Sequence, residues 1–447
     1  MNYAAYMNRN EINITESSQP YHRFVAASVL YAVILLRDMT MFDLHYFVIV
    51  GICALAFMLL SFHDIATILV FLLPFAGGLH YHYIVLIAFL IGFAKVIRTG
   101  RINKLLIFFF FIGLILGLLN TLTGGLHEEI RTAITLFSYL GLVSLFVCYA
   151  DKLEIETLIK YFIIGTILSI IHVVYISLSS YSLDYITTYG LRFGRLSDSS
   201  TRLTSYDANT IGLFAIAAIS LVYLLNRSKH MSTFIASLLI TLLVLLGALS
   251  ISRTYFVLMV MLAIYIIVKN TNRKDIIRVS VLLVIFAGIY FAFIQDSALY
   301  DYVIFQYMDR FSHSSVVTYG GRMTIFNHYL NVCLSSIKIF MLGAGINGYK
   351  TFYAGISAHN GLQEIILAWG ITGFILIASW ITMLIRMISQ GREKTLGLDL
   401  YLPLIMFMLF IQTIPWFSIH RYLVLFAVVL LAINVREANS TSRPKSG

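Results

Sequence analysis

Residues 104–122 read KLLIFFFFIGLILGLLNTL, an apolar run that begins with a single lysine. The hydrocarbon core of a bilayer is about 30 Å thick and takes about 20 helical residues to cross, so this run predicts a membrane-spanning helix. Similar runs recur along the chain, separated by charges, polar clusters or turns. We identify fourteen of them, at 24–36, 44–60, 65–77, 80–97, 104–122, 132–150, 161–179, 208–225, 233–250, 254–268, 279–294, 361–385, 401–418 and 421–435.

The composition of the chain supports a membrane protein. Of its 447 residues, 60% are apolar and only 12% are charged, whereas a soluble chain carries about 25% charged residues. Too few polar side chains remain to cover a core in water, which excludes an ordinary soluble domain. The three cysteines, Cys53, Cys148 and Cys333, have no CxxC spacing and indicate neither a disulfide framework nor a zinc module.

The net charge of +10 indicates how the helices are oriented. With the N-terminus in the cytoplasm, most Lys and Arg residues fall in cytoplasmic loops, as the positive-inside rule requires, so the basic excess needs no nucleic-acid partner. We predict an all-α polytopic protein with about 12–14 transmembrane helices and both termini in the cytoplasm. Its predicted parts are a cytoplasmic tail (1–23), N-terminal helices (24–179), an outer loop (180–207), central helices (208–294), a large outer loop (295–360), C-terminal helices (361–435) and a second cytoplasmic tail (436–447).

The outer loops differ from the cytoplasmic ones in that their cations are mostly arginine. Arginine presents a planar fork of donors that suits phosphate and carboxylate, whereas lysine acts as a mobile point charge. We therefore predict an anion site on the outer side. For each single arginine the alternative is an interfacial anchor or an ion pair within its loop. The outer basic residues are Arg37, Arg131, Arg192, Arg195, Arg202, Arg253, Arg310, Arg322, Arg421, Lys338 and Lys350.

Two outer segments are long enough to hold such a site. Segment 180–207 is polar and rich in turn residues, and at its end Asp207 and Asn209 are candidates to cap the next helix. Segment 295–360 has the length to form a small structure of its own, with a helix expected at Arg322–Leu334.

A glycine cluster in the second segment, Gly343, Gly345 and Gly348, spells GxGxxG. No strand precedes it, and it lies on the outer side, away from nucleotides. We interpret it as a turn and not as a dinucleotide site.

The most specific string is AHNGLQE at 358–364, at the outer start of an apolar helix. Asn360 can cap this helix, with Gln363 reaching back in a variant of the capping box. His359 lies at the positive end of the helix dipole, which favours the neutral ring, and a neutral imidazole accepts a proton near pH 7. The alternative is a purely structural histidine.

Two further outer motifs accompany this string. The first is the tight turn Ser250-Ile251-Ser252-Arg253, where a cation is expensive unless it meets water or an anion. Snorkelling of Arg253 to the headgroups is the alternative. The second is Gly321-Arg322, at the start of the helix expected in the large outer loop.

Together these motifs resemble the O-antigen polymerase and O-antigen ligase (Wzy-type) superfamily of bacterial membrane proteins. The resemblance rests on the His-Asn pair followed by nine residues and GxxG, on the Ser-x-Ser-Arg turn and on Gly-Arg. It also rests on Arg310 followed by ten residues and a glycine, and on the basic loop that leads to Asn209. It covers about 190–385; residues 1–180 agree only in being membrane helices. The matching glycines are Gly370, Gly373 and Gly321.

The resemblance implies a GT-C-like glycosyltransferase on the outer side of the bacterial inner (plasma) membrane, with an undecaprenyl diphosphate-linked oligosaccharide as donor. It implies His359, Arg253 and Arg322 as catalytic residues, and no cofactor. The outer segments hold no DxD-like pair, and Glu128 and Glu129 lack further metal ligands, so we expect no metal site. The expected partners are the bilayer, a flippase and a chain-length regulator. The substrate-binding candidates are Arg195, Arg202, Arg310, Asn360 and Asn209.

Three other functions remain open. An O-antigen ligase, which transfers the chain to lipid A core, needs the same arginines and histidine. A polysaccharide transporter or flippase should show broken helices with charges near midspan or an internal repeat, whereas here His172 is the main charge-capable residue at a span centre. An oligosaccharyltransferase is disfavoured because the outer carboxylates of its metal site are missing. We favour the polymerase because of the Arg310 to Gly321 spacing and the divergent N-terminal half.

Overall fold

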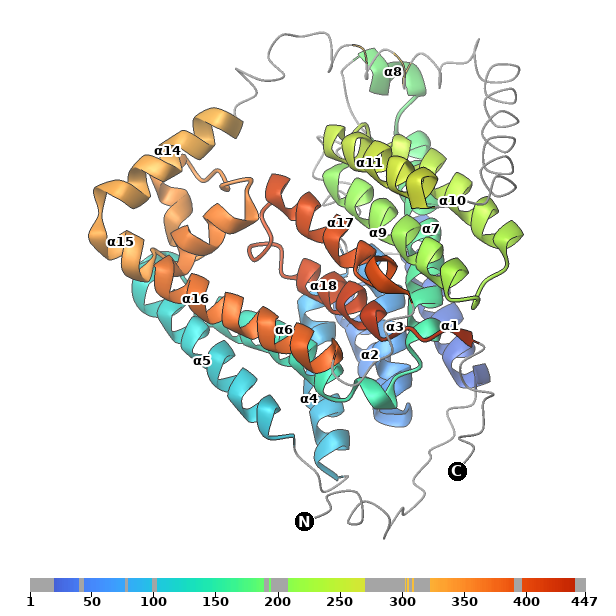
Figure 1. The fold of residues 1–447 in the computed structure, drawn as a ribbon, viewed down its shortest axis with the longest axis horizontal. Helices are drawn as coiled ribbons and strands as arrows, with labels where there is room; N and C mark the ends of the chain where they lie inside the picture. The colour runs from blue at the N-terminus through green and yellow to red at the C-terminus, as the bar shows by residue number, and fades with distance from the viewer. Residues whose placement is uncertain are drawn as a thin grey trace.

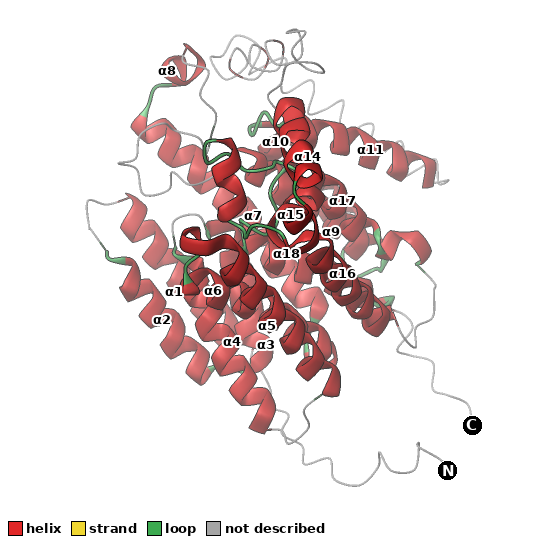
Figure 2. Ribbon diagram, turned by 90° about the vertical axis from the view of Figure 1, so that its left-hand side faces the viewer, coloured by secondary structure: helices red, strands yellow, loops and turns green. Residues whose placement is uncertain are grey.

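The computed structural model describes residues 20–39, 44–76, 79–98, 103–188, 193, 208–269, 302, 304, 308, 322–389 and 396–438, and the structural statements below concern these residues. Among them the secondary structure is helical, without a strand, as Figure 2 shows. The predicted all-α class is confirmed for this part of the chain.

The helices keep the labels of Figure 1. They are α1 (Pro20–Met39), α2 (Tyr46–Leu59), α3 (Phe62–Leu72), α4 (Tyr81–Arg98), α5 (Lys104–Gly124), α6 (Ile130–Cys148), α7 (Ile155–Ser180), α8 (Leu183–Thr188), α9 (Ala208–Arg227), α10 (Thr233–Ala248), α11 (Arg253–Lys269), α14 (Arg322–Ser335), α15 (Ile337–Leu342), α16 (Gly361–Ser389), α17 (Leu402–Phe410) and α18 (Arg421–Leu431). Short 3-10 helices follow or connect several of these α-helices. Three of them are used below, η2 (Leu73–Phe75), η6 (Gly348–Tyr353) and η8 (Ile411–Thr413). The helix predicted at Arg322–Leu334 is α14, and the predicted span 279–294 lies outside the described residues.

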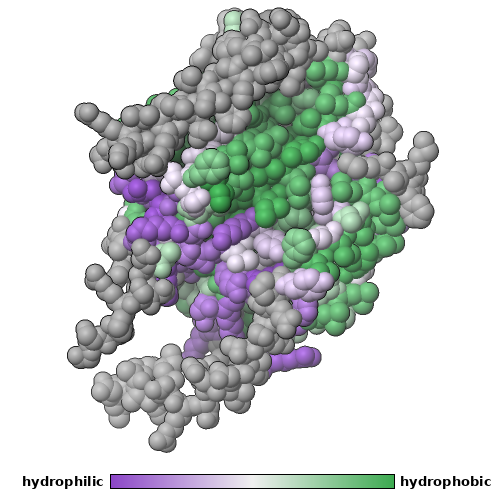
Figure 3. All heavy atoms as spheres, turned by 90° about the vertical axis from the view of Figure 1, so that its right-hand side faces the viewer, coloured by the Kyte–Doolittle hydropathy of each residue, from purple (hydrophilic) through white to green (hydrophobic). Residues whose placement is uncertain are grey.

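Six described helices are long and apolar enough to cross a membrane, and five shorter apolar helices accompany them. The six are Tyr81–Arg98, Lys104–His127, Ile130–Cys148, Ile155–Ser180, Asn209–Arg227 and Gly361–Ser389. Large apolar side chains lie exposed on α10 and α11, among them Phe234, Leu238, Val257 and Ile264. Figure 3, which views the molecule from the side on which these helices lie in Figure 1, shows a broad hydrophobic area bordered by hydrophilic residues. Such an area suits lipid and would be costly in water.

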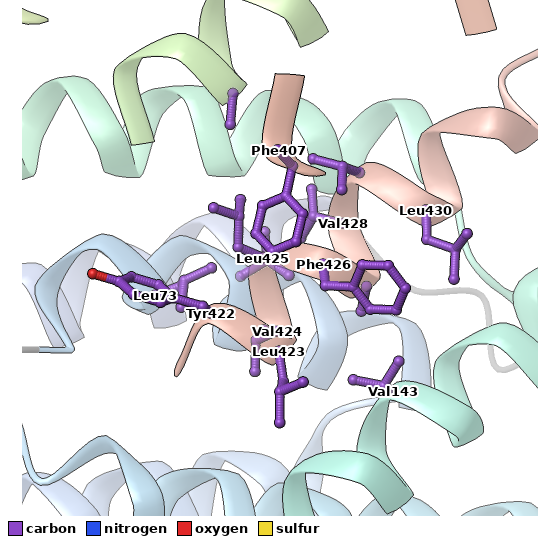
Figure 4. Close-up of a cluster of buried hydrophobic side chains, with 14 of the residues drawn as sticks. Leu73, Val143, Phe407, Tyr422, Leu423, Val424, Leu425, Phe426, Val428 and Leu430 are labelled. Carbon is purple, nitrogen blue, oxygen red and sulfur yellow. The ribbon is translucent and has the colours of Figure 1, made fainter. Parts of the chain in front are cut away.

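Helix α18 forms the centre of the bundle. Its sequence RYLVLFAVVLL is apolar on every side, and Tyr422–Leu431 are all buried. A helix with this pattern must be surrounded by other helices. In Figure 4, Val143 from α6, Phe407 from α17 and Leu73 from η2 pack around it, and α3, α7 and α16 also contact it.

The predicted span 401–418 is too long. Helix α17 and η8 end at Thr413, which leaves 12 residues, or about 18 Å of helix, against a bilayer core of about 30 Å. Ile414 is extended, with φ −140° and ψ 155°, because a residue before proline is pushed out of the helical region and Pro415 follows. Apolar composition predicted burial here but not helix length.

Buried carboxylates mark the two ends of the bundle. At one end, which we call the Asp399 end, Arg227 at the end of α9 pairs with Asp399 (Nε to Oδ2, 3.2 Å), and Tyr265 of α11 donates to the same carboxylate (2.5 Å). At the other end, which we call the Glu364 end, α9, α11, α16 and α18 begin and Glu364 is fully buried.

Helix α16 is broken at Gly370, where φ is 65° and ψ is −167°, a backbone conformation that is essentially restricted to glycine. The break frees carbonyl groups that receive donors from the segment after α15. Ala344 donates to the Leu367 carbonyl (2.8 Å) and Gly345 to the Ala368 carbonyl (2.9 Å). The C-terminal part of α16 then runs beside α5 and α6, as Figure 1 shows.

We predict that Gly370→Ala lowers the free energy of unfolding by roughly 2–5 kcal/mol, because a Cβ there is strained and overlaps the backbone of Met341. Thermal unfolding of the purified protein in detergent measures the effect. Gly51→Ala in α2 is the matched control, since a Cβ at that position meets no atom within 4 Å. Equal melting temperatures for the two variants would show that the break at Gly370 is not required.

Candidate functional site

The Glu364 end brings three of the predicted motifs together through hydrogen bonds. Ser252 Oγ, in the turn between α10 and α11, donates to Asn209 Oδ1 at the start of α9 (3.0 Å). Thr254 Oγ1, two residues on, donates to Thr413 Oγ1 (3.0 Å). The connection is completed by Asn360 Nδ2 at the start of α16, which donates to the carbonyl of Gln412 (3.2 Å).

Two predicted catalytic residues adjoin this chain of bonds. Arg253 lies between Ser252 and Thr254, and His359 precedes Asn360. Motifs that are more than 100 residues apart in sequence thus share one end of the bundle, joined by the loop between α17 and α18.

The Glu364 end is electrostatically positive. Among the helices that begin there are α9, α11, α16 and α18, whose N-termini present the positive ends of the helix dipoles. Arg253 is the first residue of α11, and within the described part of the chain it has no ion-pair partner. Arg421 is the first residue of α18 and donates to Thr210 Oγ1 (3.4 Å). An anion such as a phosphate is the ligand that this field favours.

Two buried carboxylates of this end, Glu364 and Glu128, hold its loops in place, whereas a third, Asp38 of α1, pairs with Arg37 and His172. Glu364 accepts hydrogen bonds from three successive backbone N–H groups, those of Trp416 (2.6 Å), Phe417 (2.8 Å) and Ser418 (2.8 Å), and from the Ser418 hydroxyl. Its charge is therefore satisfied by the loop between α17 and α18.

Glu128, before α6, plays the same part for the segment that leads to His359. It accepts from Asn120 Nδ2 (2.9 Å), from the backbone of Asn347 and from that of Gly348 (3.4 Å). The predicted glycine turn lies here, and Gly343 and Gly345 have positive φ values of 79° and 80°.

Two of the predicted motifs hold a residue with a strained backbone. His359 has a φ of 51°, and Ile251, in the Ser-x-Ser-Arg turn, has a φ of 48°. A β-branched residue with positive φ is a genuine outlier, and such residues cost about 1–3 kcal/mol each and gather at functional sites. The fold therefore holds both motifs in conformations that local sequence does not favour.

The two long outer segments meet at the same turn. Phe193, Tyr302, Ile186 and Ile251 form a small buried cluster, in which the Phe193 N–H donates to the Tyr302 hydroxyl (3.3 Å). Residues from both segments thus pack against Ile251, two positions from Arg253.

Several predicted site residues remain undescribed. Arg195, Arg202 and Arg310 lie outside the described residues, and Arg322 begins α14 with its side chain undescribed.

The two capping predictions had mixed outcomes. Asn360 Oδ1 accepts from the N–H of Gln363 (2.9 Å), which confirms Asn360 as the helix cap. The reach-back of Gln363 is wrong, because its side chain is buried and donates to the carbonyl of Phe326 in α14 (2.7 Å). Asn209 does not cap α9 either, since the helix begins at Ala208 and Asn209 Oδ1 accepts from Ser252 instead; Asp207, the other candidate cap, lies outside the described residues.

Sequence reasoning missed His420, which precedes α18 in the loop that Glu364 holds. Its ring lies 5.7 Å from that of Tyr139 in α6. The pKa of His420 is lowered to about 4, mainly by burial and also by the nearby Lys350 and His82, while a hydrogen bond with the Phe417 backbone opposes the shift. A signal existed, because His420-Arg421 is a polar pair between two apolar runs.

Comparison with known proteins gives no family for this chain: no protein-family model matches it, and no curated protein matches it. The chemistry of the Glu364 end is therefore argued from its own residues.

We predict that Glu364→Ala lowers the free energy of unfolding by roughly 3–5 kcal/mol, because it leaves three buried N–H groups without an acceptor. Glu364→Gln should lose clearly less, since a side-chain oxygen remains. The tryptophan fluorescence of the purified protein during heating reports the transition. Similar, small losses for both variants would contradict the role of Glu364 as the anchor of this loop.

A pH dependence follows from His420. Its pKa is about 4 in the folded protein and about 6.5 in the unfolded chain, so the unfolded state binds more protons between these values. The contribution of His420 to the free energy of unfolding is complete above pH 6.5. It falls as the pH drops towards 4 and is lower by roughly 2 kcal/mol at pH 4.5. Melting temperatures at pH 7.5 and 4.5 should therefore differ more for the wild type than for His420→Gln. The same difference in both proteins would rule out His420 as the cause.

Proposed function

We propose that the chain is a bacterial inner-membrane glycosyltransferase of the O-antigen polymerase type. It joins undecaprenyl diphosphate-linked oligosaccharide repeats on the outer face of the membrane. The observation that carries the proposal is the hydrogen-bonded connection from Asn209 through the Arg253 turn to Asn360. It joins three of the motifs on which the resemblance to Wzy-type enzymes rests, those at Asn209, Arg253 and Asn360.

The distribution of basic residues supports an outward Glu364 end. The Asp399 end carries lysines and arginines from many helix ends and short connections, as the cytoplasmic side of a membrane protein does. These include Arg23, Lys95, Lys104, Lys152, Arg227, Lys229, Lys269 and Arg436. The proposed orientation therefore has both described ends of the chain on the cytoplasmic side.

The positive Glu364 end suits the departure of a lipid diphosphate. In the proposed reaction, the bond between the anomeric carbon and the diphosphate oxygen breaks, and undecaprenyl diphosphate leaves with the electron pair. Negative charge develops on that oxygen, where fixed cations stabilise it most. Arg253 and Arg421 fill this role, with the N-termini of α11 and α18 in support. Arg322 and the loop residues Arg195, Arg202 and Arg310 are further candidates.

His359 is the proposed base. The acceptor hydroxyl attacks the anomeric carbon from the side opposite the diphosphate, which inverts the configuration, and His359 takes its proton. In an alternative role, His359 only orients the acceptor hydroxyl. Its positive φ fits either role, since strain of this kind persists where function requires one conformation.

The break in α16 is a feature that favours a transporter. In transporters, the unwound backbone of a broken helix binds the substrate. Here the carbonyls of Leu367 and Ala368 accept from Ala344 and Gly345, so the break is filled by protein backbone. We therefore prefer the enzyme, and the ligase reaction remains the first alternative.

The test incubates purified protein with undecaprenyl diphosphate-linked repeats from the source strain, with a chelator and no added metal, and resolves the products on a gel. We expect a ladder from the wild type, a rate lower by about 10²–10⁴ for His359→Ala and by about 10²–10³ for Arg253→Ala. Arg253→Lys should recover only part, because it lacks the planar fork. Arg98→Ala, an exposed arginine at the Asp399 end, is the control and should match the wild type.

Other outcomes separate the alternatives. Transfer that occurs only when lipid A core is added indicates a ligase. No turnover with either acceptor would favour the transporter.

A further inference from the structure

Six side chains gather at the Glu364 end where α2, α4 and α6 begin. They are His45, Tyr46, His80, His82, Tyr83 and Arg131, and we call them the aromatic cluster. None of them belongs to the motifs used above, except that Arg131 is one of the outer arginines.

The rings of the aromatic cluster lie against one another, at interplanar angles that range from 7° for Tyr46 and Tyr83 to 65° for His80 and His82. The centroids of Tyr46 and His80 are 3.9 Å apart, and those of His45 and Tyr46 are 4.4 Å apart. The planes of Tyr46 and Tyr83 differ by only 7°, with centroids 6.1 Å apart. His45 and His80 are exposed, and both tyrosines are half-buried. The cluster thus offers flat apolar faces beside polar ring atoms.

Arg131 adds a fixed cation to this surface. Its Nη2 lies 2.7 Å from His82 Nε2, and its guanidinium carbon lies 5.5 Å from the centroid of the Tyr83 ring. The side chain is exposed, and no carboxylate pairs with it in the described part of the chain. These contacts orient the Arg131 guanidinium, and its remaining N–H donors are available to a ligand.

Helix α6 connects the aromatic cluster with the candidate site. Arg131 is the second residue of α6, and three residues before it Glu128 binds the turn that leads to His359. Further along α6, Tyr139 packs on His420, and His82 is near enough to His420 to affect its titration.

We propose that the aromatic cluster binds a sugar ring of the acceptor saccharide, and so positions the acceptor beside the site that holds the donor diphosphate. A pyranose packs its apolar face on an aromatic ring and presents its hydroxyl groups at the edge, where His82 and Arg131 provide hydrogen-bonding partners. Aromatic side chains that only anchor a protein at the membrane interface need no mutual contacts. Here the rings at the starts of α2 and α4 contact one another, and the Arg131 guanidinium lies over the Tyr83 ring.

This inference rests on the proposed function for the identity of the acceptor, but the binding can be measured without turnover. The probe is the free oligosaccharide repeat, released by mild acid from the lipid-linked pool of the source strain. It is titrated against the full-length protein in lipid nanodiscs, and saturation-transfer NMR gives the dissociation constant. We expect Tyr46→Ala and Tyr83→Ala each to raise this constant about fivefold, and Tyr83→Phe, which keeps the ring, to change it less.

Tyr175→Ala is the matched control, since Tyr175 is an exposed tyrosine of α7 outside the aromatic cluster, and it should bind as the wild type does. Melting temperatures verify that all variants are folded. No binding by the wild type, or equal binding by wild type, Tyr46→Ala and Tyr83→Ala, would overturn the inference. Binding that depends on the cluster in a protein that makes no polymer would instead leave the saccharide surface standing and reject the polymerase.

Discussion

The Glu364 end depends on one interaction, in which the fully buried carboxylate of Glu364 accepts hydrogen bonds from three successive backbone N–H groups. A buried charge is stabilising only when its hydrogen-bonding capacity is filled, and irregular backbone within a membrane bundle needs partners for its donors. Glu364 and the loop at Trp416–Ser418 meet both needs at once. The loop in turn places Gln412 and Thr413 on one side and Arg421 on the other. Without this anchor, the contacts that join the starts of α9, α11 and α16 would have no common partner.

The sequence predicted the helices well where burial alone determines them. The helices α5, α6 and α9 could be predicted by comparing the length of their apolar runs with the thickness of a bilayer. The burial of α18 could be predicted because its sequence is apolar on every side. The prediction was wrong where the backbone leaves the helix for a tertiary partner. The run at 401–418 stays apolar to Phe417, but Pro415 and the acceptor on Glu364 end the helix early. The break at Gly370 likewise depends on donors from Ala344 and Gly345, which no local pattern reveals.

The candidate site divides in a similar way. Arg253 and the His359-Asn360 pair were predictable because each breaks a local rule, a cation in a tight outer turn or a histidine at the start of an apolar helix. Glu364 was not predictable, because a glutamate in the first turn of a helix is common. Only the four hydrogen bonds that its carboxylate accepts give it a special role. The mutual placement of the motifs also needed the structure, because the link through Thr254, Thr413 and Gln412 joins three loops that share no pattern.

Asp399 and Glu364, the buried carboxylates after which the two ends are named, have different partners, and this difference bears on the proposed reaction. At the Asp399 end the carboxylate is paired with Arg227, so a cation and an anion cancel within the protein. At the Glu364 end the carboxylate is satisfied by backbone N–H groups, which carry only partial charges. Arg253 has no internal counterion in the described part of the chain, and it lies at the end of the bundle where α9, α11, α16 and α18 begin. A cation left unpaired at the edge of an apolar bundle is unfavourable in the empty protein. In the proposed reaction, a bound diphosphate makes this cation favourable, most of all as charge builds on the departing oxygen, and that is the condition for stabilising a transition state more than a ground state.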